Sequence, residues 1–424
     1  MKIVVVNAFA RGNRGDAALL SVAIQQLQRA YPGAEIAIAG FEEPGEWPEF
    51  DGIPNLGSIR RYVGDEQAGR AARISRKVLA AALALIAAVP GGGAPLRALA
   101  GALPREMRAE LRALAGADLV LSLGGGYLNG RADFASDLSI GFLLLPLWLA
   151  GRFGVPVVLA PQSYGPFPTR VQRAMTRRVL GASRRVVARE AISVARLAEA
   201  GVPSANLVRG VDSAFAFRSR SQRAWRSELG IAPEATVVLV TARQFLEPSA
   251  QSVYEEAMAV AVRHLLGRDG CHVVLVPQVT CTFQADDDRI VNRRIAAAVE
   301  GPGLHVLDDE LIDHHDVFAL YASADLILGT RFHSVIFGLV AGVPCAAIEY
   351  DHKTRGIMED LGLGEWVVRM ADARPQVLTE LVDRLAAGAG AYREHLRDVL
   401  PGYSARAEEF TDLLRADVPQ PVRR

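Results

Sequence analysis

The segment 325–356 constrains the fold of this 424-residue chain more than any other part of its sequence. The short apolar run 326–328 has the composition of a buried parallel strand, and 334–341 is typical of a small apolar helix. A second apolar run, 345–348, leads directly into polar residues. This order predicts a strand–helix–strand unit whose two strands are parallel and adjacent.

Basic residues and one histidine follow both strands of this unit. Arg331 and His333 come after the first strand, and Lys353 and Arg355 come after the second. Because the carboxyl ends of parallel strands meet at one edge of a sheet, we expect these four side chains to crowd that edge, where open α/β sheets bind ligands. Cations beside a helix N-terminus favour a small anion, so the pattern predicts an anion site.

The alternation of strands and helices runs through most of the chain and restarts once. Apolar runs that end in glycine or polar residues alternate with helical patterns over 2–209 and again from residue 237. We therefore predict an α/β protein of the GT-B-like kind, with two Rossmann-like domains and parallel sheets that face each other across a cleft. The N-terminal domain is expected at 1–215 and the C-terminal domain at 216–375, with C-terminal helices over 376–424.

The segment 60–115 departs from this alternation and is predicted to be an apolar helical insertion. Basic residues precede 78–89, whose twelve residues are almost all apolar. That length is too short for a bilayer, which takes about 20 residues. An inserted helix packed on the N-terminal domain is the simpler interpretation. A basic flank beside an apolar helix also suits peripheral membrane contact through 73–89, and this alternative stays open.

Charge, cysteine content and the N-terminus exclude several classes of protein. Lys plus Arg and Asp plus Glu both number 47, so no net charge points to nucleic acid. The three scattered cysteines do not suggest a disulfide framework or a zinc site. Acidic residues around His314 and His315 suit a helix start better than a metal, so no metal is expected. The chain begins without the apolar core of a signal peptide, which predicts a cytoplasmic protein, with the inner face of the membrane as its possible peripheral location.

Three loops of the N-terminal half are further candidates for a site. The loop 12–16, Gly-Asn-Arg-Gly-Asp, lacks the spacing of a dinucleotide fingerprint, which disfavours a nicotinamide cofactor. Its Asp16 either caps the following helix or takes part in binding. Three glycines at 124–126 follow a predicted strand and either admit a ligand to the backbone or allow a positive φ. Gln162 follows the next strand.

Taken in order, these segments resemble the bacterial polysaccharide pyruvyl transferases. The matching elements are Asn7 with 12–16, the glycines 124–126, the turn 162–166, 188–190 with Ser193, 210–215, and 331–334 followed by Tyr350 and Lys353. The resemblance covers residues 3–365, and its most distinctive parts are Arg-x-His-Ser and Tyr-x-x-Lys. The segment 60–115 is longer and more apolar than the family pattern, on the side expected to hold the acceptor.

The resemblance implies transfer of pyruvate from phosphoenolpyruvate to two hydroxyls of a sugar in a polysaccharide or glycan precursor, which forms a cyclic ketal. It implies no cofactor beyond phosphoenolpyruvate as co-substrate, and an acceptor that is lipid-linked, nucleotide-linked or free. The donor carries a carboxylate and a phosphate, so several cations should hold it. His333 is the expected general acid or base, because imidazole exchanges protons near neutral pH.

The other expected site residues fall into three groups. The groups are Asp16 and Glu190 as bases for the acceptor hydroxyls; Arg331, Lys353, Arg355, Arg189, Arg243 and Ser334 around the donor; and Asn13, Gly15, Gly124, Gly125, Gly126 and Gln162 in backbone loops near the acceptor.

Two other functions fit much of the same pattern. A glycosyltransferase with a nucleotide-sugar donor would have a similar fold and a similar anion site. A non-catalytic sugar-binding member of a glycan assembly system would bind ligand without forming product, although it leaves the cluster of Arg331, His333 and Lys353 hard to explain.

Overall fold

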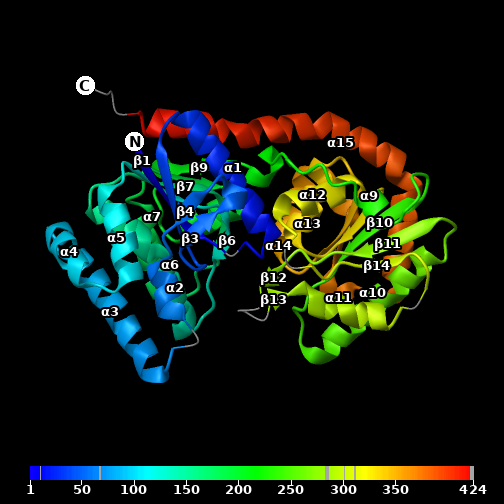
Figure 1. The fold of residues 1–424 in the computed structure, drawn as a ribbon, viewed down its shortest axis with the longest axis horizontal. Helices are drawn as coiled ribbons and strands as arrows, with labels where there is room; N and C mark the ends of the chain where they lie inside the picture. The colour runs from blue at the N-terminus through cyan, green and yellow to red at the C-terminus, as the bar shows by residue number, and fades with distance from the viewer. Residues whose placement is uncertain (10, 66–67, 282–285, 300, 310–311, 421–424) are drawn as a thin grey trace. The chain divides into compact units, whose positions relative to one another are not determined.

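The computed structural model describes residues 1–9, 11–65, 68–281, 286–299, 301–309 and 312–420 (Figure 1). Contacts divide the chain into two compact units. Unit 1 comprises Met1–Ala10, Leu19–Ser213 and Arg406–Arg424, and unit 2 comprises Arg11–Ala18 and Ala214–Ala405. The division after Ser213 lies close to the boundary expected at 215. The structure differs from that expectation at 11–18, which belong to unit 2, and at 406–424, which belong to unit 1.

Unit 1 is built on a nine-stranded sheet that is parallel except for the pairing of β3 with β4. The strand order is β3-β4-β2-β1-β5-β7-β8-β9, and β6 pairs with β7. The strands are β1 (Lys2–Ala8), β2 (Glu35–Gly40), β3 (Gly45–Trp47), β4 (Ile53–Asn55), β5 (Leu119–Ser122), β6 (Gly125–Leu128), β7 (Val157–Tyr164), β8 (Arg185–Ala188) and β9 (Leu207–Arg209).

Helices cover this sheet and fill the predicted insertion. They are α1 (Arg14–Ala30), which begins in unit 2, then α2 (Ile59–Gly64), α3 (Arg70–Ala88), α4 (Gly93–Leu99), α5 (Arg105–Gly116), α6 (Phe134–Arg152), α7 (Arg170–Leu180) and α8 (Ala191–Glu199). The segment 60–115 consists mainly of helices joined by short turns, as expected, and its residues 66 and 67 lie outside the described residues. Its α3 and α5 share a hydrophobic core with α6 and with β1 and β5 of the sheet.

Unit 2 contains a second, fully parallel sheet with the order β14-β11-β10-β15-β16-β17. Its strands are β10 (Thr236–Thr241), β11 (Cys271–Leu275), β14 (Leu304–Val306), β15 (Leu326–Gly329), β16 (Cys345–Glu349) and β17 (Val367–Arg369), and β12 (Thr280–Cys281) forms a small antiparallel pair with β13 (Asp286–Asp287). Its helices are α9 (Trp225–Glu228), α10 (Pro248–Leu266), α11 (Asp288–Ala297), α12 (His314–Ala322), α13 (Phe332–Val340), α14 (His352–Asp360) and α15 (Pro375–Asp417), which ends in unit 1. The two parallel sheets confirm the predicted α/β class.

The strand–helix–strand unit predicted at 325–356 is confirmed as β15, α13 and β16. β15 and β16 are adjacent and parallel, with Leu328 opposite Ala346. All residues of both strands are buried, which explains why their sequences are continuous apolar runs without alternation. The carboxyl ends of the two strands therefore open at the same edge.

The glycine run 124–126 has a backbone explanation within unit 1. A Cβ on Gly124 would lie 2.4 Å from the carbonyl oxygen of Pro161, and Gly125 adopts a φ of 148°. Gly125 pairs with Gln162 across β6 and β7. Gly124 and Gly125 therefore have a backbone explanation that requires no ligand.

Among the described residues, α6 is the one helix long and apolar enough to cross a membrane by length and composition. Its window has a mean hydropathy of 1.6, and 44% of that window is buried inside the structure. Ile140, Leu143, Leu147 and Leu149 of α6 are all buried in the core of unit 1. Core packing therefore accounts for part of the apolar composition of α6.

Candidate active site

The candidate site lies in unit 2, where β10, β15 and β16 end side by side. Thr241 at the end of β10 pairs with Gly329 at the end of β15, and Gly329 pairs with Ala347 of β16. The chain then continues into Arg243, into 331–334 and into 350–355 from these three strands. The predicted edge therefore collects the polar segments of three strands.

The helix α13 begins at this edge and holds His333 in its first turn. Arg331 is the N-cap residue, with φ −75° and ψ 135°, but its side chain makes no capping bond. The hydroxyl of Ser334 instead donates to the Arg331 carbonyl at 2.5 Å and lies 2.9 Å from the Thr241 hydroxyl. Ser334 is fully buried and His333 only partly, so the histidine is the more accessible of the two.

Arg331 is held by two carboxylates. Its Nε and Nη2 atoms donate to Asp288 Oδ1 at 3.0 and 2.6 Å, and its Nη1 donates to Asp286 Oδ2 at 3.2 Å. Burial by itself lowers the pKa of the Arg331 guanidinium, but the charges of Asp288 and Asp286 outweigh burial and raise that pKa. A guanidinium compensated in this way contributes mainly to the internal structure of unit 2.

Arg243 extends this network and is less completely compensated. Its Nη2 lies 3.6 Å from Asp286 Oδ2, a carboxylate that Arg331 already binds. Its Cζ lies 4.3 Å from the centroid of the Tyr350 ring. Its Nε is buried and makes no hydrogen bond to the described residues. A buried guanidinium N–H that still lacks an acceptor is suited to an anionic ligand.

The N-terminal loop 12–16 also belongs to unit 2, where it docks on the segment after β11. The amide of Arg14 donates to the Gln278 carbonyl at 3.1 Å, and the amide of Thr280 donates to the Gly12 carbonyl at 2.8 Å. The Arg14 side chain is 2% exposed and donates to the Ile312 carbonyl at 3.0 Å. Its burial lowers the pKa of this guanidinium.

Gly15 brings this loop against His333. A Cβ at Gly15 would lie 2.0 Å from His333 Nδ1 and 2.5 Å from its Cβ, so only glycine leaves room for the imidazole. One residue on, Asp16 Oδ2 accepts from the Asn13 side-chain amide at 2.7 Å, and Asn13 Oδ1 accepts from the Asp16 amide at 3.4 Å. Asn13, Gly15 and Asp16 were expected on the acceptor side in the N-terminal domain. The structure places all three in unit 2, with Gly15 against His333.

We expect Gly15→Ala to lower kcat by about 100-fold, since the added methyl must displace the imidazole by an ångström or more. Gly15 lies in the first turn of α1, where alanine is intrinsically favourable, so backbone propensity does not oppose the change. Steady-state kinetics of phosphate release measure the effect. The matched control is Gly12→Ala in the same loop, whose Cβ would meet nothing nearer than Cys281 Sγ at 3.2 Å and the Thr280 backbone at 3.4 Å. Equal activity in both variants would contradict the positioning role of Gly15.

Lys353 and Arg355 lie on α14 and have acidic partners nearby. Lys353 Nζ lies 3.0 Å from Asp351 Oδ2. Arg355 donates to Glu349 Oε1 from Nε at 2.8 Å and pairs with the same oxygen through Nη2 at 2.6 Å. The pairing of Arg355 across the start of α14 is the contact expected of a structural surface arginine.

Arg189 and Glu190 lie in unit 1, within a buried polar network. Arg189 donates to the Ser163 hydroxyl at 2.8 Å and to Asp212 Oδ2 at 2.5 Å. Glu190 accepts from the hydroxyls of Ser163 and Ser193. Gln162 is also fully buried in this unit. The contacts of Arg189 and Glu190 stabilise the interior of unit 1. The expected roles of Arg189, Glu190 and Gln162 in the reaction stay predictions.

The histidines at the start of α12 are buried and pack against an aromatic side chain. His314 and His315 are buried, and the His315 ring stacks on Phe217 with 5.2 Å between centroids. Burial and the neighbouring His315 lower the pKa of His314. Within the part of the chain that the structure describes, no group of three or more His, Cys, Asp and Glu residues could hold a metal ion.

Sequence reasoning missed the acidic half of this site. Asp286 and Asp288 were not among the predicted site residues, and their ion pairs with Arg331 were not anticipated. The run of three aspartates at 286–288 was the available signal. An acidic run at the head of a helix is also explained by the helix dipole, so this signal is weak by itself.

Comparison with known proteins identifies the family. Residues 13–352 match the family described as polysaccharide pyruvyl transferase. The chain belongs to this family. The resemblance inferred from the ordered motifs is thereby confirmed, and the family supports a transferase.

A curated relative and two solved structures extend this result. The chain is 28% identical over 389 residues, 86% of its length, to the amylovoran biosynthesis protein AmsJ of Erwinia amylovora, of which it covers 87%. UDP-GlcNAc 2-epimerase from Neisseria meningitidis bound to UDP-GlcNAc matches with TM-score 0.59 and 13% identity over 98% of this chain and all of that one. Anabaena Alr3699/HepE in complex with UDP-glucose matches with TM-score 0.55 and 13% identity over 98% of both chains. These two likenesses show a shared GT-B-like fold, and the relatives support a role in polysaccharide biosynthesis.

Proposed function

We propose that this transferase moves pyruvate from phosphoenolpyruvate to two hydroxyls of a sugar in a polysaccharide or glycan precursor. The contact of Gly15 with His333 carries the proposal, because it joins two family segments more than 300 residues apart around one imidazole. In the reaction a proton adds to the methylene carbon of the donor and one sugar hydroxyl adds to the neighbouring carbon. The bond between this carbon and the phosphate oxygen then breaks. The second hydroxyl bonds to the same carbon and closes the ketal, and its proton leaves with phosphate.

The partly exposed His333 is the proposed general acid and base for these proton transfers. It lies at the first turn of α13, where the amides of the helix terminus favour an anion nearby. Asp16 is a candidate base for an acceptor hydroxyl, since its carboxylate lies one residue from the Gly15 contact and is oriented by Asn13. No metal or organic cofactor is part of the proposal.

Arg243 is the proposed principal ligand of the donor's anionic groups. We expect Arg243→Gln to weaken phosphoenolpyruvate binding by at least tenfold, because a hydrogen bond to a charged group contributes about 1.5–3 kcal/mol. Isothermal titration calorimetry of the donor or a non-reactive analogue measures the loss. Arg355→Gln is the matched control, since Arg355 already pairs with Glu349 and should leave the Kd unchanged. If only Arg355→Gln weakens binding, the donor lies at α14 instead.

A nucleotide-sugar glycosyltransferase is the second candidate, because solved structures with this fold contain UDP-glucose and UDP-GlcNAc. Carbon-labelled phosphoenolpyruvate and labelled UDP-sugars, each incubated with the protein and a panel of glycan acceptors, separate the two functions. Label transfer from phosphoenolpyruvate with release of phosphate supports the proposal. Transfer from a UDP-sugar alone overturns it, and sugar binding without any transfer identifies a non-catalytic protein.

A further inference from the structure

The helix α3 of unit 1 is apolar on two opposite faces. Ala80, Leu83 and Ala87 form the face that is buried in the core. On the other side, Ile74, Val78 and Leu85 are 55%, 63% and 70% exposed. Their spacing of four and seven residues places them in one stripe along the helix. An amphipathic helix of a soluble domain would carry polar residues along this stripe.

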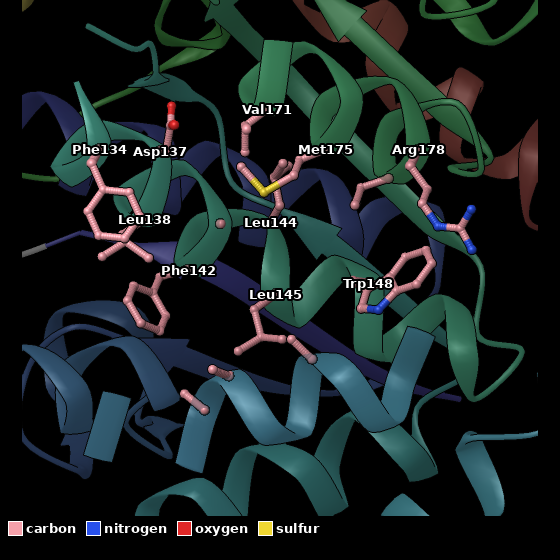
Figure 2. Close-up of a pocket in the computed structure, with 15 residues that line it drawn as sticks. Phe134, Asp137, Leu138, Phe142, Leu144, Leu145, Trp148, Val171, Met175 and Arg178 are labelled. Carbon is pink, nitrogen blue, oxygen red and sulfur yellow. The ribbon is translucent and has the colours of Figure 1, made fainter. Parts of the chain in front are cut away.

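An apolar groove runs beside α3, between this helix, α6 and α7 (Figure 2). The groove has a volume of about 400 Å³, and all but two of its lining residues, Asp137 and Arg178, are apolar. Figure 2 shows Leu138, Phe142, Leu145 and Trp148 of α6 along the groove, with Val171 and Met175 of α7 on one side.

The groove and the α3 stripe together leave large apolar side chains in contact with water. Phe134 and Val171 at the groove are 75% and 52% exposed, in addition to the three side chains of α3. Contiguous apolar surface of this kind marks an interaction site on a soluble protein. The charged residues of the same helices indicate which kind of partner binds this surface.

The helices that form this surface are rich in basic residues, although Asp137 also lines the groove. Residues 70–104, which contain α3, include five Arg or Lys residues and no Asp or Glu. Helix α7 carries four arginines, at 170, 173, 177 and 178, and no acidic residue. The whole chain has equal numbers of basic and acidic residues, so this excess is local. Arg73 and Lys77 flank the α3 stripe and are exposed, and Arg178 lies 4.8 Å from the Trp148 ring centroid at the groove.

We propose that the face formed by α3, α6 and α7 binds the interface of an anionic lipid bilayer. Apolar side chains beside exposed arginine and lysine match a surface where acyl chains lie beneath anionic headgroups. A second copy of the chain fits less well, because a two-fold contact would bring two basic faces together. The core packing of α6 means that unit 1 lies on the membrane with its fold intact. A lipid-linked glycan would present its sugar at that surface.

Flotation of the full-length protein with vesicles tests the proposal. We expect the wild type to float with vesicles of phosphatidylglycerol and phosphatidylethanolamine. It should not float with vesicles of phosphatidylcholine alone. Leu85→Glu together with Val78→Glu should lower the partition coefficient at least tenfold, since it places charge on the inserted stripe. Arg73→Gln and Lys77→Gln should each lower it roughly fivefold, the effect of about 1 kcal/mol per basic residue.

The control variant is Val377→Glu, which changes an apolar residue of α15 that is 37% exposed in unit 2. It should float like the wild type. The proposal is overturned if the wild type stays unbound to anionic vesicles, floats equally with phosphatidylcholine, or loses no binding in the α3 variants. Sedimentation analysis without lipid measures the oligomeric state and so tests a second copy of the chain as the partner of this face. A dimer that Leu85→Glu dissociates would assign the face to that second copy. Because binding is measured without substrates, its failure leaves the proposed reaction untouched.

Discussion

His333→Gln is expected to lower kcat by about 100-fold to 10,000-fold while the protein remains folded. The imidazole is the proposed proton donor and acceptor, and positioned acid–base groups typically contribute this much. Glutamine keeps similar size and hydrogen-bonding capacity but cannot exchange protons near neutral pH. His333 is partly exposed on the first turn of α13, so the change removes little core packing. Phosphate release from the donor, measured at saturating acceptor, gives kcat.

Two controls separate chemistry from structure in this variant. Its thermal unfolding midpoint should match that of the wild type, and its Kd for phosphoenolpyruvate should change by only a few-fold. His395→Gln is the matched histidine variant, since His395 lies on α15 and contacts the Leu361 carbonyl at 2.7 Å. Wild-type turnover in His333→Gln would remove this residue from the mechanism.

Arg331→Met is expected to destabilise unit 2 by about 3–5 kcal/mol, because it leaves Asp288 buried without its counter-charge. Arg331 is 5% exposed and Asp288 is 1% exposed. Urea unfolding followed by tryptophan fluorescence measures the change in free energy. The result would show that Arg331 mainly stabilises the fold, because its ion pair connects α13 to the start of α11.

Arg355→Met provides the comparison for a more exposed ion pair. Its side chain is 36% exposed, and pairs of this kind contribute about 1 kcal/mol or less. The double variant Arg331→Met with Asp288→Asn should recover part of the lost stability, since no buried charge is left unpaired. If Arg331→Met unfolds like the wild type but no longer binds phosphoenolpyruvate, Arg331 is a donor ligand and the structural interpretation is wrong.

The parts of the fold that sequence reasoning predicted well depend on local pattern. β15, α13 and β16 were expected from two apolar runs separated by one helical stretch, and their parallel pairing follows from the handedness of such crossovers. The glycines at 124–126 were correctly expected to have a backbone reason. The structure shows that this reason is the approach of Gly124 to the Pro161 carbonyl.

Interactions between distant residues could not be predicted in the same way. Arg331 was predicted to hold the donor because it follows a buried strand, yet its partners Asp286 and Asp288 come from another segment. Arg243 was ranked below it, although the structure leaves the Arg243 Nε without a hydrogen bond to the described residues. The charge of a residue is a property of the sequence, whereas its compensation depends on which carboxylates the fold brings near.

The sequence by itself determined the α/β class, the two-part organisation, the family and the candidate histidine, because each depends on residue type and order along the chain. Only the tertiary structure showed that 12–16 belong to unit 2, although the strand before them belongs to unit 1. It also showed that Gly15 packs against His333. The physical reason is that close packing depends on distances between atoms of remote segments. A missing Cβ is visible in the sequence, but the side chain that occupies its place is visible only in the folded chain.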